Sequence, residues 1–357
     1  MHVGVAFITG VSGQDGSYLA ELLIEKGYIV HGMVRRSSNM VNLDRLVHLH
    51  GHPHMHTHYG DVTDLPSIMR IMRRAADDLG TNQILEVYNL AAQSHVKVSF
   101  DVPIYTAATD ALGTLNVLEA IVQLDIIARV RVYQASTSEL FGSTPPPQNE
   151  ASSMCPQSPY AVSKLFAHWS IKNYRDVYGI YAVSGILFNH ESERRAENFV
   201  TRKISKFVAG LYHGRQTGPL HLGNLNALRD WGHAKDYVLA MWMMLQQGDA
   251  DDYVISTGEQ HSVREFVETA LAVIGKRIQW RGTGLDEKGY LVDEGGHGGD
   301  GWHIVEVDPS YFRPTEVETL LGDSSKAREK LGWMHATSFE SLVRLMVHQD
   351  IEQCKKE

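Results

Sequence analysis

The sequence predicts a doubly wound α/β protein, in which a parallel Rossmann sheet is joined to a second, smaller α/β domain. Strand patterns rich in apolar residues alternate with amphipathic helix patterns, and a glycine-rich turn joins the first strand to the first helix. This alternation of strand and helix patterns ends near residue 188, where loops lengthen and glycine clusters begin. We therefore expect residues 1–188 to form the Rossmann domain and residues 189–357 to form the smaller domain, which completes a cleft.

The individual elements follow from the hydrophobic pattern. Strands are predicted at residues 3–9, 29–34, 55–60, 85–90, 130–135 and 182–188. Helices are predicted at residues 17–26, 65–79, 105–124 and 159–178. Parallel sheets built in this way bind ligands beyond the carboxyl ends of their strands. The segments that directly follow the strands are therefore the first places to look for a site.

Composition and charge exclude several classes of protein. The chain has 357 residues, 43% of them hydrophobic, and a net charge of −9, which argues against a general nucleic-acid binder. Its two cysteines, Cys155 and Cys354, have neither the number for a disulfide framework nor the spacing of a zinc site. No apolar run has membrane-spanning length, so we expect a cytoplasmic protein without membrane contact.

A histidine-rich stretch, HLHGHPHMHTHYGD, follows the second predicted strand. It contains His48, His50, His52, His54, His56 and His58. Alternate spacing can place several imidazoles on one face of a strand, where they are able to bind a metal. A strand alone cannot surround an ion without ligands from elsewhere, however, and no Cys or Glu is interleaved. We therefore interpret the stretch as a polar loop and exposed strand, and we predict no metal site.

The glycine-rich turn reads TGVSGQDG and contains Gly10, Gly13 and Gly16. Glycine allows a positive φ and lets the backbone approach a ligand closely. A turn from a strand into a helix also points unpaired amides and the positive end of the helix dipole at a phosphate. The spacing GxxGxxG is a weak signal by itself, but its position between the first strand and the first helix favours a dinucleotide site.

The end of the second strand discriminates between the two nicotinamide dinucleotides. An NAD site carries an acidic residue there to bind the ribose hydroxyls, whereas this chain reads GMVRRSS. Arg35 and Arg36 can form charge-assisted bonds with a 2′-phosphate, and Ser37 and Ser38 can add hydroxyl donors. A solvated basic turn is the alternative. Downstream of this glycine loop, NADP is the cofactor that we predict.

Two further segments follow strands and suit the same cofactor. Asp61, in GDVTD, can accept a hydrogen bond from an adenine amino group, or it can cap a turn. In the stretch NLAAQSH, the small residues Ala91 and Ala92 allow the chain to pass beneath a flat cofactor. Tight packing of the chain would require the same small residues.

The strongest chemical signal combines two stretches, ASTSELFG and SPYAVSKLFAHW. Tyr160 and Lys164 are four residues apart and therefore share one face of a helix that Pro159 begins. A nearby ammonium lowers the pKa of a tyrosine, so we expect Tyr160 to act as a base toward a substrate hydroxyl. The YxxxK spacing is common by chance, but here it follows a Ser/Thr-rich strand end and the glycine loop.

These motifs together resemble the extended short-chain dehydrogenase/reductase family, and within it the subgroup of dehydratases that act on GDP-mannose. The resemblance covers nearly the whole chain and is most specific in NHESERR, ENFVTRKI, RDWGHAKDYV and YFRPTEVETLLGD. It implies a hydro-lyase that uses NADP, forms a homodimer or homotetramer, and takes GDP-mannose as its small-molecule substrate. It also implies that the chain re-enters the first domain after about residue 224.

The resemblance implies a reaction in which the sugar is oxidised and reduced again within one site. Tyr160 removes the proton from the C4 hydroxyl, and Thr137 hydrogen-bonds the same oxygen. Glu139, which follows Ser138, then removes the C5 proton and assists loss of the C6 hydroxyl as water. The product is GDP-4-keto-6-deoxymannose, the precursor of GDP-deoxyhexoses such as GDP-L-fucose or GDP-D-rhamnose.

The resemblance also implies a larger set of binding residues. Beyond those already named, the cofactor contacts are Gln14, Asp15, Val62, Leu90, Gln93, Ser94, Tyr105, Lys164, His190 and Arg195. The substrate contacts are Ser94, Thr137, Ser138, Glu139, Tyr160, Asn189, Lys203, Arg229, Arg313 and Glu316. Arginine suits such a site because its guanidinium group fits phosphate oxygens in fork geometry.

Two alternatives remain open at the level of sequence. Another nucleotide-sugar dehydratase or a 4-epimerase of the same family would keep Tyr160 and Lys164, but an epimerase needs no base at C5, and Glu139 argues against it. A catalytically silent NADP-sensing protein would be expected to lose the tyrosine, the lysine or the glutamate, and all three are present.

Overall fold

A large parallel sheet forms the centre of the molecule. The computed structural model describes residues 2–36, 40–292, 301–311, 315 and 317–355. The sheet has seven strands in the order β11-β6-β5-β4-β1-β2-β3, and every neighbouring pair is parallel. The strands are β1 (Val5–Thr9), β2 (Ile29–Val34), β3 (Met55–Tyr59), β4 (Leu85–Asn89), β5 (Val130–Ala135), β6 (Tyr181–Leu187) and β11 (Tyr253–Ile255).

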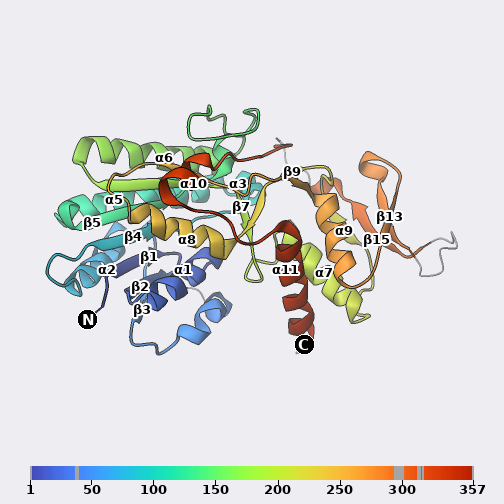
Figure 1. Cartoon of the computed structure of the whole chain (residues 1–357), viewed down its shortest axis with the longest axis horizontal. Helices are drawn as coiled ribbons and strands as arrows, with labels where there is room; N and C mark the ends of the chain where they lie inside the picture. The colour runs from blue at the N-terminus through green and yellow to red at the C-terminus, as the bar shows by residue number, and fades with distance from the viewer. Residues whose placement is uncertain (1, 37–39, 293–300, 312–314, 316, 356–357) are drawn as a thin grey trace.

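Helices cover both faces of this sheet, as the doubly wound prediction requires. One face packs against α1 (Gln14–Glu25) and α8 (Ala234–Leu245), whose apolar residues share one buried core with the sheet. The other face packs against α2 (Leu65–Asp77), α5 (Gly113–Gln123) and α6 (Pro159–Tyr178) around a second core. Figure 1 shows these helices on the two sides of the sheet.

The bounds of β2, β5 and α6 equal the predicted ranges, but the predicted helix at 105–124 is wrong in detail. The structure divides it into α4 (Pro103–Thr106), the π-helical turn η2 (Ala107–Leu112) and α5. It also contains an unpredicted helix, α3 (Val96–Asp101). Thr106 and Thr114 donate hydrogen bonds to backbone carbonyls four residues earlier, at 3.0 Å each, and such bonds bend helices. A π-helical turn contains one more residue than an α-helical turn. So small a change cannot be detected in the hydrophobic periodicity of a sequence, and the division of this helix was therefore not predicted.

The second half of the chain builds a separate core. A four-stranded sheet has the order β13-β14-β15-β8, and α7, α9 and α11 pack together around Trp231, Phe266 and Phe339. The elements are β7 (Asn189–Glu191), α7 (Val200–Tyr212), β8 (Leu220–Leu222), β9 (Leu228–Arg229), β10 (Trp231–His233), β12 (His261–Ser262), α9 (Val263–Val273), β13 (Ile278–Arg281), β14 (Lys288–Leu291), β15 (His303–Val307) and α11 (Phe339–Cys354).

Two segments of the second half return to the large sheet. β11 pairs with β6, α8 packs on α1, and α10 (Ser325–Leu331) packs on β11 and α8. Trp333, just after α10, is buried in the same core and donates a hydrogen bond from Nε1 to the Asp236 carbonyl at 2.8 Å. The C-terminal half therefore crosses between the two cores, as Figure 1 shows. The domain boundary at residue 188 remains a prediction.

A buried polar network fixes the carboxyl ends of three strands next to one another. Thr9 Oγ1, at the end of β1, donates to Asn89 Oδ1 at the end of β4, at 2.6 Å. Asn89 Nδ2 donates to Gln134 Oε1 on β5 at 2.7 Å. Thr9 Oγ1 also accepts the backbone N–H groups of Leu90 and Ala91 at 3.0 and 3.1 Å. Buried polar groups with these partners hold the loops that follow the strands in one arrangement.

The remaining short elements are turns of the connecting loops. They are η1 (Met40–Leu49), η3 (Ile127–Arg129), η4 (Ser138–Leu140), η5 (Gly284–Asp286) and η6 (Pro309–Tyr311). The glycine-rich stretch at 293–300 lies outside the described residues. In the part of the chain that the structure describes, every helix is too short or too polar to cross a membrane.

Candidate active site

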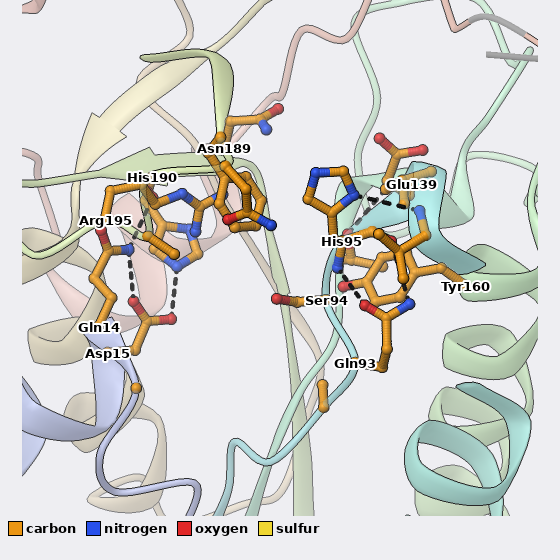
Figure 2. A pocket seen from close by; sticks show the side chains of 18 of the residues that line it. Gln14, Asp15, Gln93, Ser94, His95, Glu139, Tyr160, Asn189, His190 and Arg195 are labelled. Carbon is orange, nitrogen blue, oxygen red and sulfur yellow. Dashed lines mark hydrogen bonds and ion pairs between the residues drawn. The ribbon is translucent and has the colours of Figure 1, made fainter. Parts of the chain in front are cut away.

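A cleft of about 940 Å³ lies over the carboxyl ends of the central strands and is lined from both halves of the chain. Figure 2 shows its two walls: one carries Asp15, His190 and Arg195, and the other carries Glu139 and Tyr160. We call them the binding wall and the reaction wall. Ser94 lies between them.

The glycine turn fits a dinucleotide phosphate. Gly10 has φ +69°, and a Cβ there would lie 2.9 Å from the backbone of Ala91. A Cβ on Gly16 would lie 2.4 Å from the Gly10 carbonyl oxygen, so Gly16 permits α1 to pack against the turn. Gly13 begins α1 without a side-chain cap, which leaves the first amides of the helix to a ligand.

An ion pair on the binding wall joins the two halves of the chain. Asp15 Oδ2 lies 2.7 Å from His190 Nε2, and His190 Nδ1 lies 2.8 Å from the Phe188 carbonyl oxygen. Burial by itself would raise the pKa of Asp15 and lower that of His190. The mutual attraction and hydrogen bond outweigh burial, so the pKa of Asp15 is lowered and that of His190 is raised. Both shifts favour the charged forms of the two side chains.

Neighbouring side chains hold this pair in place. Gln14 Nε2 donates to the His190 carbonyl oxygen at 3.0 Å, and Gln14 Oε1 accepts from Ser192 Oγ at 2.8 Å. Arg195 Nε lies 2.9 Å from Glu191 Oε2, and its guanidinium stacks 3.6 Å above the Phe199 ring. The predicted residues Gln14, Asp15, His190 and Arg195 are thus brought together.

The two arginines after β2 have different surroundings. Arg35 lines the cleft, and its Nη1 donates to the hydroxyl of Tyr105, another predicted cofactor contact. Arg36 is exposed, lies over the Tyr59 ring at 5.4 Å, and is not among the residues that line the described cleft. Ser37 and Ser38 lie outside the described residues. Of these two arginines, Arg35 is therefore the one placed to meet a ligand in the cleft.

The remaining predicted cofactor residues line the same cleft. Asp61 Oδ1 accepts the backbone N–H of Thr63 at 2.9 Å, so the turn-capping role that the sequence suggested is present. This contact leaves its second oxygen available for a further role. The other members of the set that line the cleft are Val62, Leu90, Ala91, Ala92, Gln93 and Ser94.

The reaction wall is built by the start of α6 and the turn η4. Ser158 Oγ caps α6 by accepting the Ala161 N–H at 3.1 Å, which places Tyr160 in the first turn of the helix. Thr137 Oγ1 accepts the Glu139 N–H at 3.2 Å, so Thr137 caps η4 and presents the buried Glu139. The Thr137 side chain lies close enough to Tyr160 to oppose the rise in the pKa of Tyr160. These three residues and Lys164 line the cleft together.

The expected effect of Lys164 on Tyr160 is wrong for the protein without cofactor. The pKa of Tyr160 is raised, first by burial and then by the negative charge of Asp110. Lys164 Nζ donates to the Ala135 carbonyl oxygen at 3.1 Å and lies 5.9 Å from the Tyr160 ring centre. Burial also lowers the pKa of Lys164. In this environment desolvation outweighs the attraction that the four-residue spacing suggested.

Asp110 is a functional candidate that the sequence analysis missed. Its Oδ1 accepts the Gln93 N–H at 2.7 Å, and its Oδ2 is buried without a hydrogen-bond partner among the described residues. Burial raises the pKa of Asp110 to about 6, against the opposing effects of Lys164 and the Gln93 N–H. The signal in the sequence is an acid inside an apolar helical pattern, where an unpaired carboxylate is costly.

The other predicted substrate residues that the structure describes also line the cleft: Asn189, Lys203 and Arg229 come from the second half of the chain, and Ser138 comes from η4. Lys203 Nζ lies 3.9 Å from the Tyr311 ring centre, and Arg229 Nη1 donates to the Leu228 carbonyl oxygen at 2.8 Å. Arg313 and Glu316 lie outside the described residues. Tyr311 also lines the cleft, and the sequence analysis did not select it.

The sheet order, the glycine turn and the Tyr160–Lys164 pair define a protein of the extended short-chain dehydrogenase/reductase class. Solved structures with a similar fold include a dTDP-glucose 4,6-dehydratase from Bacillus anthracis in complex with NAD, with a TM-score of 0.77 and 18% identity, covering 99% of this chain and 98% of that one. A UDP-glucose 4-epimerase from Thermotoga maritima with UDP-glucose has a TM-score of 0.76 at 22% identity, covering 99% of this chain and all of that one (100%). At these identities the similarity establishes the fold.

Closer relatives give the family. The family model for GDP-mannose 4,6 dehydratase matches residues 7–346. The chain is 52% identical to a GDP-mannose 4,6 dehydratase of Drosophila melanogaster, over 99% of this chain and 87% of that protein. It is 51% identical to the human GDP-mannose 4,6 dehydratase, over 98% and 91% of the two chains. The chain therefore belongs to the GDP-mannose 4,6 dehydratase family.

Proposed function

We propose that this protein converts GDP-mannose to GDP-4-keto-6-deoxymannose and water, with NADP⁺ as a cofactor that is regenerated in every turnover. The observation that carries the proposal is Glu139, which is buried and lines the cleft beside Thr137 and Tyr160. A simple alcohol oxidation or a 4-epimerisation uses the tyrosine and the lysine but needs no carboxylate base to remove a C5 proton. Family membership supports the same reading.

The protein's own residues supply the proton transfers. Tyr160 removes the C4 hydroxyl proton, while Thr137, which lies next to Tyr160 in the cleft, holds the same oxygen. The resulting C4 ketone acidifies the C5 proton, which Glu139 removes. Glu139 then returns a proton to the C6 hydroxyl as it leaves as water. When bound, NADP⁺ would supply a temporary acceptor for the C4 hydride and its return to C6. C5 would take up one proton at that point and Tyr160 would release the proton that it took from C4, so the net change is the loss of one water.

The described residues fit such a cofactor. The uncapped start of α1 and the close packing of Gly10 and Gly16 leave room for a diphosphate at the glycine turn. Arg35 can meet a 2′-phosphate at the end of β2, where an NAD site would carry an acid. Lys164 donates a hydrogen bond from its ammonium group to the Ala135 carbonyl oxygen. The same ammonium group can hold the nicotinamide ribose. A lysine held by that ribose can in turn lower the pKa of Tyr160.

Lys203 and Arg229 suit the other ligand, the GDP group. Both are cations from the second half of the chain, and both line the cleft. Arg229 is nearly fully buried, and the fork of donors on its guanidinium group fits the oxygens of a diphosphate. We further propose a homodimer or homotetramer located in the cytoplasm, which sedimentation and cell fractionation can test.

One experiment tests the reaction and separates it from the alternatives. The purified chain is incubated with GDP-mannose and catalytic NADP⁺ in D₂O, and the nucleotide sugar is followed by mass spectrometry and NMR. We expect loss of one water, one solvent deuterium at C5 and no net NADPH. A C4 epimer of unchanged mass would identify an epimerase, and an unchanged sugar in the presence of bound NADP⁺ would identify a sensing protein. Either result overturns the proposal.

A further inference from the structure

We propose that His31, His56 and Asp78 form a binding site for a divalent transition-metal ion such as zinc, at the outer edge of the large sheet and apart from the cleft. One nitrogen from each histidine and one carboxylate oxygen lie within 4.8 Å of one another. None of the three residues is among the described residues that line the cleft. The site therefore concerns the edge of the sheet and is independent of the proposed reaction.

Three separate elements bring these ligands together. His31 is on β2, His56 is its register partner on the edge strand β3, and Asp78 ends α2, which covers this face of the sheet. Figure 1 shows β3 beyond β2 at the edge of the sheet. The objection that a strand alone cannot surround an ion is thus answered, because His31 and Asp78 supply ligands from outside the histidine-rich stretch.

The donor atoms suit zinc better than a hard cation. Two imidazole nitrogens and one carboxylate oxygen are common zinc ligands, and water completes such a site. Tetrahedral bonds of about 2.0–2.1 Å require donor atoms about 3.4 Å apart. His31 Nε2 already lies 2.8 Å from Asp78 Oδ2, and the exposed His56 can turn toward them without disturbing the core.

The charge of Arg74 acts on His31 and repels a cation to some degree, so we expect a site of moderate affinity.

His58 acts on the site as a positioning residue. His58 Nε2 lies 3.0 Å from His31 Nδ1, and the two rings are stacked with an interplanar angle of 6°. A metal on His31 Nε2 leaves the ring proton on Nδ1, where it can be donated to His58. This is the outer hydrogen bond that orients metal-bound histidines in proteins.

Zinc titration of the untagged, full-length, chelator-treated chain tests the proposal. We expect one zinc per chain in calorimetry, with at least about tenfold weaker binding for His56→Ala and for Asp78→Asn. His54→Ala is the matched control, because His54 is in the same stretch but is not part of the cluster; its affinity should equal that of the unmodified chain. His58→Ala should weaken binding about tenfold while one zinc still binds.

A second readout keeps the test independent of folding defects. Zinc should raise the melting temperature of the unmodified chain and of His54→Ala, and it should have no such effect on His56→Ala or Asp78→Asn. Because His56 is exposed, His56→Ala should have nearly the same melting temperature as the unmodified chain without zinc. Asp78→Asn keeps a side-chain oxygen that can accept a hydrogen bond from His31. Absence of binding by the unmodified chain, or equal binding by His56→Ala and Asp78→Asn, would overturn the proposal. Chelation should leave turnover of GDP-mannose unchanged, which separates this site from the proposed function.

Discussion

Two buried carboxylates have pKa shifts of opposite direction. On the binding wall, Asp15 is 2.7 Å from His190, and this partner holds the pKa of Asp15 below its ordinary value. Asp110 acts through its charge on Tyr160 and Lys164 of the reaction wall. One of its oxygens has no hydrogen-bond partner among the described residues, and burial raises its pKa to about 6. Asp15 lies on α1, directly after the glycine turn, whereas Asp110 lies on the π-helical turn η2.

The difference shows how one cleft can combine binding with proton transfer. A paired and fully hydrogen-bonded wall is rigid and keeps its charges whether or not a ligand is present. A wall with under-solvated ionisable groups changes protonation easily, because small changes in surroundings move their pKa values. Changes on the reaction wall should therefore reduce turnover, whereas changes on the binding wall should reduce affinity for the cofactor.

Tyr160→Phe should have the largest effect. Loss of a general acid–base group costs about 10²–10⁴ in rate, and Tyr160 is assigned to the first step, so the loss should approach the upper end. Little NADPH should form when the variant is mixed with NADP⁺ and GDP-mannose, as measured by absorbance. Tyr174→Phe is the control, because Tyr174 is on the same helix but hydrogen-bonds Glu119 outside the cleft. Equal rates for the two variants would refute the assignment of Tyr160.

Glu139→Gln separates the two steps of the proposed reaction, oxidation at C4 and removal of the C5 proton. The variant keeps the shape of the side chain but lacks the base, so turnover should fall about 10²–10⁴-fold. Oxidation at C4 should persist, so NADPH should accumulate on the protein while exchange of solvent deuterium into C5 is lost. If this variant forms the 4-keto-6-deoxy product at the unmodified rate, the base is another residue.

Asp110→Asn measures the cost of the unpaired carboxylate. A raised pKa means that the folded protein holds the proton more tightly than the unfolded chain, so this group favours folding at low pH and loses that contribution as pH rises through about 6. A rise from 3.8 to about 6 corresponds to about 3 kcal/mol above pH 7. The variant should therefore be more stable than the unmodified chain at pH 8 and about equal to it at pH 4 in urea unfolding. A difference that does not depend on pH would contradict this account.

Arg35→Ala and Arg36→Ala compare two adjacent residues at the end of β2, one inside the cleft and one outside it. Arg35 lines the cleft and Arg36 does not, so only Arg35 is expected to make a charge-assisted bond worth about 1.5–3 kcal/mol. Calorimetry should show NADP⁺ binding weakened about ten- to hundredfold for Arg35→Ala and less for Arg36→Ala, with NAD⁺ binding nearly unchanged. Equal affinity of the unmodified chain for NAD⁺ and NADP⁺ would contradict the predicted cofactor preference.

The sequence by itself determined the parallel sheet and most elements that carry the site. The bounds of β2, β5 and α6 equal the predicted ranges, because short apolar runs and Ser158–Pro159 at a helix start are local signals. The glycine turn and the spacing of Tyr160 and Lys164 are local as well. Where the local structure of a residue is determined by its neighbours in the chain, it can be predicted without knowing which other elements pack against it.

Only the tertiary structure decided which distant residues meet. Asp15 and His190 are 175 residues apart, and nothing in either segment indicates their ion pair. Asp110, on a π-helical turn, acts through its charge on Tyr160 and Lys164, and His31 meets Asp78 because α2 covers β2. The raised pKa of Tyr160 has the same origin. Because the whole fold determines how far Tyr160 is buried, the loss of solvation that raises its pKa cannot be predicted from the four-residue spacing of Tyr160 and Lys164.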